Sequence, residues 1–245
     1  MTDPKSTSLQ SHIQAVKKGD RVFENAFQSV SRMILEKEIN KVTVNGKTTF
    51  DFTIFREGKK HIIGMYDEIN SFVSFVKDAS QGGSSKEMAF VLVGEPGNGK
   101  TFLVEYLCAL YRNFLFQPKN RKYTFRFTGL DRLGTYGAIK TIESQTYEDP
   151  MVLALNLFES REESMQYLAR KFKISDALLE QWAENYRPLG ACSAYIWNDL
   201  RTLHDGNIEE TLKNIELVPV PLVESLGTVT GKYPAKDKIT SSAVD

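Results

Sequence analysis

The stretch from Gly94 to Thr101 has the residue types and spacing of a phosphate-binding loop. Its sequence, GEPGNGKT, matches the pattern G-x-x-x-x-G-K-[ST] at every fixed position. Glycines let the backbone curl around a phosphate and bring its N–H groups close to the oxygens. We expect Lys100 to neutralise the β and γ phosphates, and the Thr101 hydroxyl to bind Mg²⁺. The motif therefore predicts binding of a nucleoside triphosphate.

The remaining positions of the loop are variable in this pattern. Glu95 and Asn98 have no assigned chemistry, and Pro96 is expected to stiffen the loop. The predicted nucleotide-contacting residues of this region are Gly94, Glu95, Pro96, Gly97, Asn98, Gly99, Lys100, Thr101 and Phe102. The alternative is a glycine-rich turn that precedes a helix by chance, and the flanking elements argue against it.

Both flanks of the loop fit the phosphate-binding interpretation. The apolar run Met88–Val93 predicts a buried strand, and apolar residues at spacings of three and four predict a helix from about Gly99 to about Phe116. The N-terminus of that helix would direct N–H groups and positive dipole at the phosphates. Tyr123–Thr128 alternates like a second strand. The order strand, helix, strand predicts an α/β fold with a parallel sheet and a right-handed crossover.

A small helical and hairpin module is expected before this core. Apolar residues between Ile13 and Leu35 predict one or two amphipathic helices, interrupted near Gly19. Alternating residues on both sides of Asn45-Gly46 predict a hairpin. An amphipathic helix then follows Met65 and leads through a flexible link to the strand before the loop.

The C-terminal half is predicted to be mainly helical. Asp149-Pro150 has the form of a helix start, with an acidic cap followed by proline. Helical patterns continue to about Asn214, and prolines at 219 and 221 are expected to prevent regular structure after that. The predicted organisation is a module at 1–60, a nucleotide-binding core at 61–159, a helical insertion at 160–215 and an irregular segment at 216–245.

Composition restricts the class of protein. The formal net charge is zero, which gives no electrostatic reason to expect nucleic acid or an anionic membrane as the partner. The N-terminus lacks an apolar signal core, and no apolar run approaches the length of about 18 residues that spans a membrane. Cys108 and Cys192 have no metal-ligand spacing, so we interpret them as buried thiols in a reducing cytoplasm. The sequence therefore predicts a soluble cytoplasmic protein.

One expected part of an ATPase is missing from the sequence. Such enzymes need a short apolar strand that ends in an acidic residue, which holds the Mg²⁺ shell and orients the attacking water. The two candidates are Leu155–Glu159, which the preceding cap makes helical, and Val220–Glu224, which contains a proline. Neither fits, and no further core strand follows. We therefore expect a core that is incomplete at its C-terminus, in a piece of a longer protein.

Four segments carry a resemblance to a known family: Val22–Leu35, His61–Asn70, Val91–Thr101 and Glu143–Met151. They resemble the PrkA family of bacterial serine protein kinases, over nearly the whole chain. The resemblance implies an AAA-type ATPase domain with a three-layer core, bound ATP and Mg²⁺, a protein substrate and ring-forming homo-oligomers. It also implies that Ile62, Ile63 and Gly64 lie beside the adenine, for which a buried turn before a helix is the alternative.

Kinase activity itself cannot be inferred from these residues. The sequence has no His-Arg-Asp catalytic loop, and Asp51-Phe52-Thr53 is not an Asp-Phe-Gly motif. His12, His61 and His204 have no metal or triad spacing. Two alternatives stay open: a regulatory or interaction module that binds nucleotide without turnover, and an ATPase associated with proteolysis. A GTP-specific switch is disfavoured because no Asn-Lys-x-Asp sequence follows the loop.

The missing acidic strand leads to a prediction about turnover. We expect this chain alone to hydrolyse ATP slowly or not at all, because nothing in it is placed to orient the attacking water. A phosphate-release assay that shows turnover of about one per second or faster, within the ordinary range of enzymes, would contradict this expectation.

Overall fold

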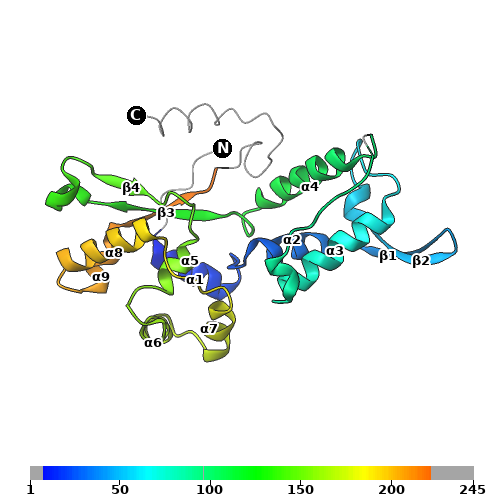
Figure 1. Ribbon diagram of the computed structural model, residues 1–245. Helices are drawn as coiled ribbons and strands as arrows, with labels where there is room; N and C mark the ends of the chain where they lie inside the picture. The colour runs from blue at the N-terminus through cyan, green and yellow to red at the C-terminus, as the bar shows by residue number, and fades with distance from the viewer. Residues whose placement is uncertain (1–7, 96, 222–245) are drawn as a thin grey trace. The chain divides into compact units, whose positions relative to one another are not determined.

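The computed structural model describes residues 8–95 and 97–221, which form a mixed α/β protein with two compact units (Figure 1). Among the described residues, one unit comprises residues 8–25 and Leu115–Val220, and the other comprises Ala26–Phe114 and Pro221. The hairpin and the phosphate loop therefore belong to one unit. The predicted helical insertion at 160–215 belongs to the other, together with the strand at Tyr123–Thr128.

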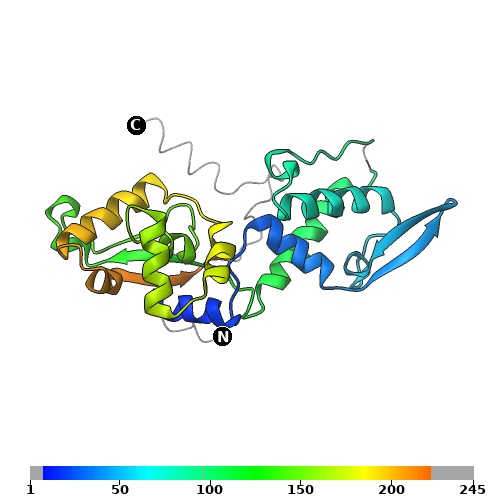
Figure 2. The ribbon, with the colours of Figure 1, turned by 90° about the horizontal axis from the view of Figure 1, so that it is seen from below.

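The unit that holds the phosphate loop contains two packed helices, a hairpin and the helix after the loop (Figure 2). Its elements are α2 (Ala26–Leu35), β1 (Ile39–Val44), β2 (Lys47–Phe52), the 3-10 turn η1 (Thr53–Arg56), α3 (Tyr66–Ser80), the 3-10 turn η2 (Ser84–Glu87) and α4 (Lys100–Leu115). Helices α2 and α3 pack against each other, and the apolar side chains of α3 that face inward are buried. The structure confirms the predicted helices after Met65 and after the loop.

The hairpin forms as the sequence predicts. Strands β1 and β2 pair antiparallel, from Ile39 opposite Phe52 to Val44 opposite Lys47. The two turn residues, Asn45 and Gly46, have φ angles of 50° and 77°. Positive φ at both central residues is the geometry of the tight hairpin turn that Asn-Gly sequences favour.

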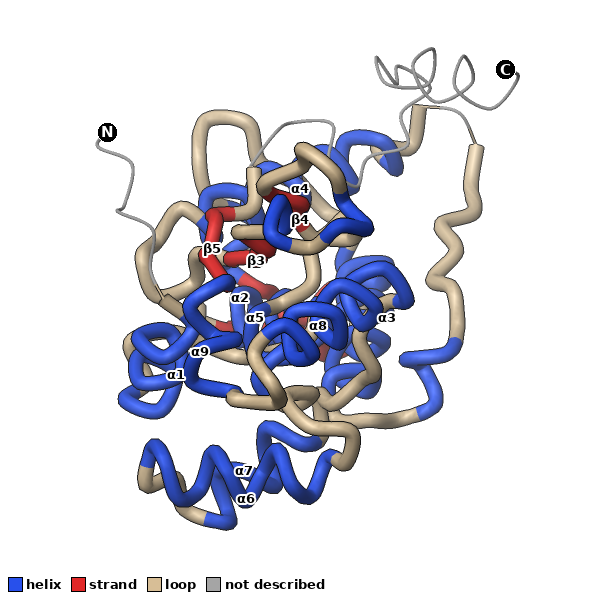
Figure 3. Tube along the Cα trace, turned by 90° about the vertical axis from the view of Figure 1, so that its left-hand side faces the viewer, coloured by secondary structure: helices blue, strands red, loops and turns tan. Residues whose placement is uncertain are grey.

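The second unit consists of a three-stranded sheet with helices on one face (Figures 1 and 3). Its elements are α1 (Leu9–Lys18), β3 (Tyr123–Thr128), η3 (Leu130–Arg132), η4 (Gly134–Tyr136), β4 (Thr141–Glu143), α5 (Pro150–Ala154), α6 (Arg161–Phe172), α7 (Asp176–Ala183), α8 (Ala191–Leu203), α9 (Ile208–Thr211), η5 (Leu212–Asn214) and β5 (Ile215–Pro219). Phe125 and Phe127 of the central strand are fully buried in a core shared with Met151, Leu168 and Trp197.

Local signals at the helix ends are confirmed. Helix α1 ends at Gly19, which adopts a left-handed conformation with φ 79°. Asp149 caps α5 because its carboxylate accepts a hydrogen bond of 2.8 Å from the Met151 N–H, and Pro150 occupies the first helical position. This helix ends at Ala154, so the apolar run after it turns instead of extending the helix.

The predicted parallel sheet is not formed. In the part of the chain that the structure describes, every paired strand is antiparallel, and β3 lies between β4 and β5. Strand β5 occupies residues predicted to be irregular. Pro219 is tolerated there because it ends an edge strand, where a missing N–H leaves no neighbour unpaired.

The strand predicted immediately before the phosphate loop is also absent. Met88–Val93 is extended but belongs to no sheet. Phe90 packs against Phe72 and Phe75 of α3, with ring centroids 5.4 Å apart in each pair. Val91 and Val93 on the alternate face are 71% and 89% exposed, respectively. The prediction of a buried strand was wrong here because no described strand lies beside this run to pair with its backbone.

Two smaller expectations concern the cysteines and membrane spans. Cys108 is half-buried, and burial raises the pKa of its thiol, whereas Cys192 is exposed, contrary to the prediction. Cys192 lies in the first turn of α8, on the side that faces away from the core. No helix between residues 8 and 221, as far as the structure describes them, is long and apolar enough to cross a membrane.

The buried ring of His12 leads to a prediction about pH. Burial, reinforced by the Arg21 and Lys122 cations, lowers the pKa of His12 from 6.5 to about 3. The unfolded chain therefore binds a proton on this ring below pH 6.5 while the folded chain does not. The contribution of His12 to stability is complete above pH 6.5 and is lost progressively as the pH falls toward 3.

We expect the wild type to lose about 2 kcal/mol more unfolding free energy than a His12→Gln variant between pH 6.5 and about pH 5. Urea unfolding at both pH values measures this difference. His61→Gln is the matched control, since His61 is exposed. An identical pH dependence of the wild type and His12→Gln would contradict the prediction.

Candidate nucleotide-binding site

The phosphate loop leads directly into α4. Gly97 and Gly99 have φ angles of 88° and 74°, in the left-handed region that favours glycine. The helix begins at Lys100, and its first turn is closed by a hydrogen bond of 2.9 Å from the Leu103 N–H to the Gly99 carbonyl. Leu103 is buried and anchors this turn to its unit. The loop is therefore presented at the N-terminus of a fixed helix, as phosphate binding requires.

The Lys100 side chain folds back over the loop. Its ammonium group donates hydrogen bonds of 2.7 Å to the Gly94 carbonyl and 2.5 Å to the Glu95 carbonyl. These contacts hold the cation above the turn that the glycines form, and both lie in a solvent-exposed environment. A phosphate oxygen would compete with the two carbonyl groups for the same protons, and the charged acceptor makes the stronger bond.

The two residues after Lys100 are exposed on the first turn of α4. Thr101 has its side chain in solvent, and Phe102 is 37% exposed. The Phe102 ring lies beside the ring of Tyr106, with centroids 5.9 Å apart. From Phe102 an open groove of about 470 Å³ runs along α4, and the backbone around Glu57 and Gly58 forms its other wall. A planar apolar group can therefore be accommodated next to the phosphate loop.

The turn predicted to contact the base has one buried residue and one exposed residue. Ile62 is 2% exposed, and its N–H donates a hydrogen bond of 3.0 Å to the Phe55 carbonyl. Ile63 is 84% exposed. Gly64 and Met65 then have φ angles of 71° and 53°, which reverse the chain into α3. Of the two isoleucines in this turn, Ile63 is therefore the one whose side chain a ligand could reach.

The structure brings this turn next to the phosphate loop. A Cβ atom built on Gly99 would lie 3.5 Å from the Met65 sulfur. Met65 and Gly99, which are far apart in the sequence, therefore lie close together. Both predicted parts of the site belong to the same compact unit.

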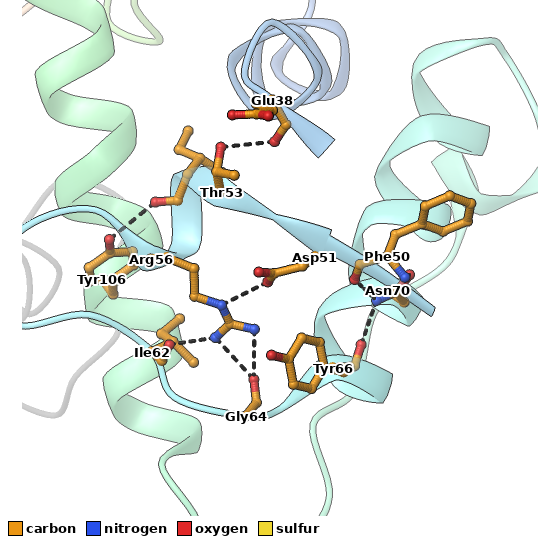
Figure 4. A network of polar contacts seen from close by, with 11 residues as sticks. Glu38, Phe50, Asp51, Thr53, Arg56, Ile62, Gly64, Tyr66, Asn70 and Tyr106 are labelled. Carbon is orange, nitrogen blue, oxygen red and sulfur yellow. Dashed lines mark hydrogen bonds and ion pairs between the residues drawn. The ribbon is translucent and has the colours of Figure 1, made fainter. Parts of the chain in front are cut away.

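The same turn is surrounded by a polar network that no sequence pattern predicts (Figure 4). The Arg56 guanidinium donates to the Asp51 carboxylate at 2.8 Å, to the Ile62 carbonyl, and to the Gly64 carbonyl at 3.1 Å. Its plane lies over the Tyr66 ring, 4.7 Å from the centroid. Arg56 matches no motif. It is the first of four charged residues between positions 56 and 60, and nothing in their pattern distinguishes it.

Tyr106 joins α4 to the 3-10 turn η1. Its single hydroxyl proton is shared between the Glu57 carbonyl oxygen, 2.6 Å away, and the Ile54 carbonyl oxygen, 3.1 Å away. Burial and the nearby Glu57 carboxylate raise the pKa of Tyr106, which keeps the hydroxyl protonated as a donor. The sequence pattern assigned Tyr106 only to the apolar face of the helix.

The structure does not supply the missing acidic group. Leu155–Glu159 forms turns after α5, in the unit without the phosphate loop, and Val220–Glu224 lies outside the described residues except for Val220 and Pro221. Within residues 8–95 and 97–221, no three acidic, histidine or cysteine side chains cluster as metal ligands would. Thr101, the predicted metal ligand, lies at the end of the loop. Pro96, predicted to contact the nucleotide, lies outside the described residues.

Each of the three histidines contacts a different local partner. His12 contacts Arg21 at 2.7 Å inside one core, His61 contacts the Gly58 carbonyl at 3.2 Å, and His204 contacts Asn214 at 2.9 Å. Each ring has a local structural partner, in agreement with the absence of triad spacing in the sequence.

Comparison with known proteins gives no relative. No protein-family model, no curated protein and no solved structure matches the chain.

The left-handed glycine at the centre of the loop generates a prediction. Replacing Gly97 by alanine strains a residue at φ 88° by about 1 to 2 kcal/mol, although no atom would obstruct the new methyl group. We expect Gly97→Ala to weaken binding of inorganic tripolyphosphate about tenfold in calorimetry. Gly134→Ala is the control, since Gly134 has no positive φ and open space around it. Equal affinities of the Gly97→Ala variant and the wild type would count against this loop conformation as the binding form.

Proposed function

We propose that the chain binds Mg-ATP through the loop from Gly94 to Thr101. The observation that carries the proposal is the position of Lys100, whose ammonium lies over a turn of left-handed glycines at the start of α4. This combination places a cation, free backbone N–H groups and a helix N-terminus together, which is the chemistry that a triphosphate needs.

Lys100, Thr101 and the glycines of the loop have distinct tasks in the proposal. Lys100 exchanges its two carbonyl acceptors for β and γ phosphate oxygens and neutralises their charge. Thr101 offers its exposed hydroxyl to Mg²⁺, and the phosphates and water supply the other oxygen ligands. Bound Mg²⁺ supplies charge neutralisation between the phosphates, and the glycines allow close approach of the backbone.

The base is proposed to lie against the turn at Ile62–Gly64. Ile63 presents an exposed apolar side chain there, and Met65 brings the turn next to Gly99. Phe102, which is partly exposed at the head of the α4 groove, offers a second apolar surface. Adenine is the proposed base because the sequence lacks the guanine-recognition pattern.

The finer form of the proposal is a P-loop, AAA-type domain of a PrkA-like serine protein kinase. It requires Met88–Val93 to become a strand of a parallel sheet. The segment is already extended, with Phe90 facing α3 and Val91 and Val93 facing away, which is the alternation of a strand with one covered face. In this form, nucleotide state is coupled to protein phosphorylation or to assembly of a homo-oligomer.

The alternative is a regulatory module that binds nucleotide without turnover. It uses the same loop, so the two proposals differ in the fate of the bound ATP and not in its position. Phosphotransfer in the full-length protein that depends on Lys100 supports the kinase form, and intact phosphotransfer with altered assembly supports the regulatory form.

Substitution of Lys100 tests the binding of Mg-ATP, which both forms of the proposal share. We expect Lys100→Ala to weaken Mg-ATP binding about 10- to 150-fold, because a hydrogen bond to a charged group contributes about 1.5 to 3 kcal/mol. Titration calorimetry of the purified chain measures the affinity. The folded state should be retained, since the lysine contacts only exposed loop carbonyls.

Lys86→Ala is the matched control, because Lys86 is an exposed lysine of η2 in the same unit. Its affinity for Mg-ATP should equal that of the wild type. The proposal fails if the wild type does not bind Mg-ATP, or if Lys100→Ala binds it as tightly as Lys86→Ala does.

A further inference from the structure

We propose that Arg56 is the positioning residue of the base end of this site, holding the turn Ile62–Gly64 in the form that presents Ile63 to a purine. The inference rests on the proposed nucleotide site. It adds a residue outside the phosphate loop that determines how well the nucleotide base is recognised, as distinct from the phosphates.

The guanidinium group fits this task because it is a rigid planar donor. Its Nη1 group donates to the carbonyls of both Ile62 and Gly64, and Nη2 donates to Gly64 as well, at 3.2 Å. Both carbonyls that flank Ile63 are therefore turned toward one cation (Figure 4). A peptide turn with both flanking carbonyls fixed has little freedom left at the residue between them. Lysine cannot replace this fork, since its ammonium is a point charge on a flexible stem.

The Arg56 side chain is itself held in place by its neighbours. Nε donates to Asp51 on β2 at 2.8 Å, the Tyr66 ring lies beneath the guanidinium, and the Arg56 side chain is only 20% exposed. An ion pair that is largely buried and fixed in its geometry orders its two side chains more than an exposed pair does. The hairpin strand, η1 and the first turn of α3 thus meet at one side chain.

The same turn is connected to the phosphate loop through a second side chain. Arg56 is the last residue of η1, and the carbonyls of Ile54 and Glu57 on either side accept hydrogen bonds from Tyr106 of α4. Since α4 begins at Lys100, one helix carries both the phosphate-binding lysine and the anchor of η1. The distance between the phosphate end and the base end of the site is consequently fixed by Tyr106 and Arg56 together.

The test separates recognition of the base from recognition of the phosphates. Calorimetry compares Mg-ATP with inorganic tripolyphosphate, which has no base, for the wild type and Arg56→Lys. We expect Arg56→Lys to weaken Mg-ATP binding about tenfold and to change tripolyphosphate binding less than about twofold, since the loop itself is untouched. Arg32→Lys is the matched control. Arg32 also makes an ion pair and lies over a ring, but it sits on α2 and contacts Glu36 and Phe114.

The possible outcomes have different meanings. If Arg56→Lys weakens the binding of both ligands equally, or of neither, the positioning role of Arg56 is overturned. The proposal that the chain binds ATP is not affected by either result. A wild type that binds neither ligand overturns the proposed function, and this inference with it. An equal loss of ATP affinity in Arg32→Lys also overturns the inference, because the effect would then be one of general stability.

A second variant covers the case in which Arg56→Lys does not fold. Asp51→Asn keeps an oxygen acceptor for Nε and removes only the charge that orients the guanidinium. We expect it to weaken Mg-ATP binding about two- to threefold with tripolyphosphate unchanged. Hydrogen exchange gives a readout without nucleotide: the amides of residues 63–65 should exchange faster in the variant, and those of residues 103–106 should not. Unchanged exchange at 63–65 together with unchanged ATP affinity overturns the inference.

Discussion

Backbone N–H and C=O groups must find partners, and this requirement determines which apolar runs of the chain become regular structure. Tyr123–Thr128 has neighbours on both sides and forms the central strand β3. Met88–Val93 is as apolar but has no strand beside it among the described residues, and it stays extended. Around η1 the same need is met by side chains, because Arg56 and Tyr106 donate to carbonyls that no strand reaches. The candidate site thus lies where side chains, and not neighbouring strands, supply the hydrogen bonds of the backbone.

The two ends of the candidate site are therefore built in different ways. The phosphate end depends on backbone conformation and one cation, so it is built from consecutive residues of a single loop. The base end depends on contacts between β2, η1, α3 and α4, so it is built from residues far apart in sequence. Under the proposed function, mutations in the loop and mutations around Arg56 would therefore act on different parts of the nucleotide.

The same difference explains what the sequence could predict. The phosphate loop, the helix after it, the Asn45-Gly46 hairpin and the cap at Asp149 are set by neighbouring residues, and all were recognisable. Strand pairing depends on which segments meet in space. For that reason the parallel sheet was wrongly predicted, and β5 at Ile215–Pro219 was missed because proline tolerance depends on an edge position. The Arg56 network could not be predicted either, since a lone arginine carries no periodicity or spacing.

The extended run before the loop has a consequence for handling the protein. It belongs to no sheet among the described residues, and its Met88, Val91 and Val93 side chains are exposed. An apolar, unpaired segment of this length is a template on which a second extended chain can add by hydrogen bonding. Phe90 packs this segment against α3 through two ring contacts. The segment that precedes the phosphate loop is thus also a place where a second copy of this chain can add in concentrated solution.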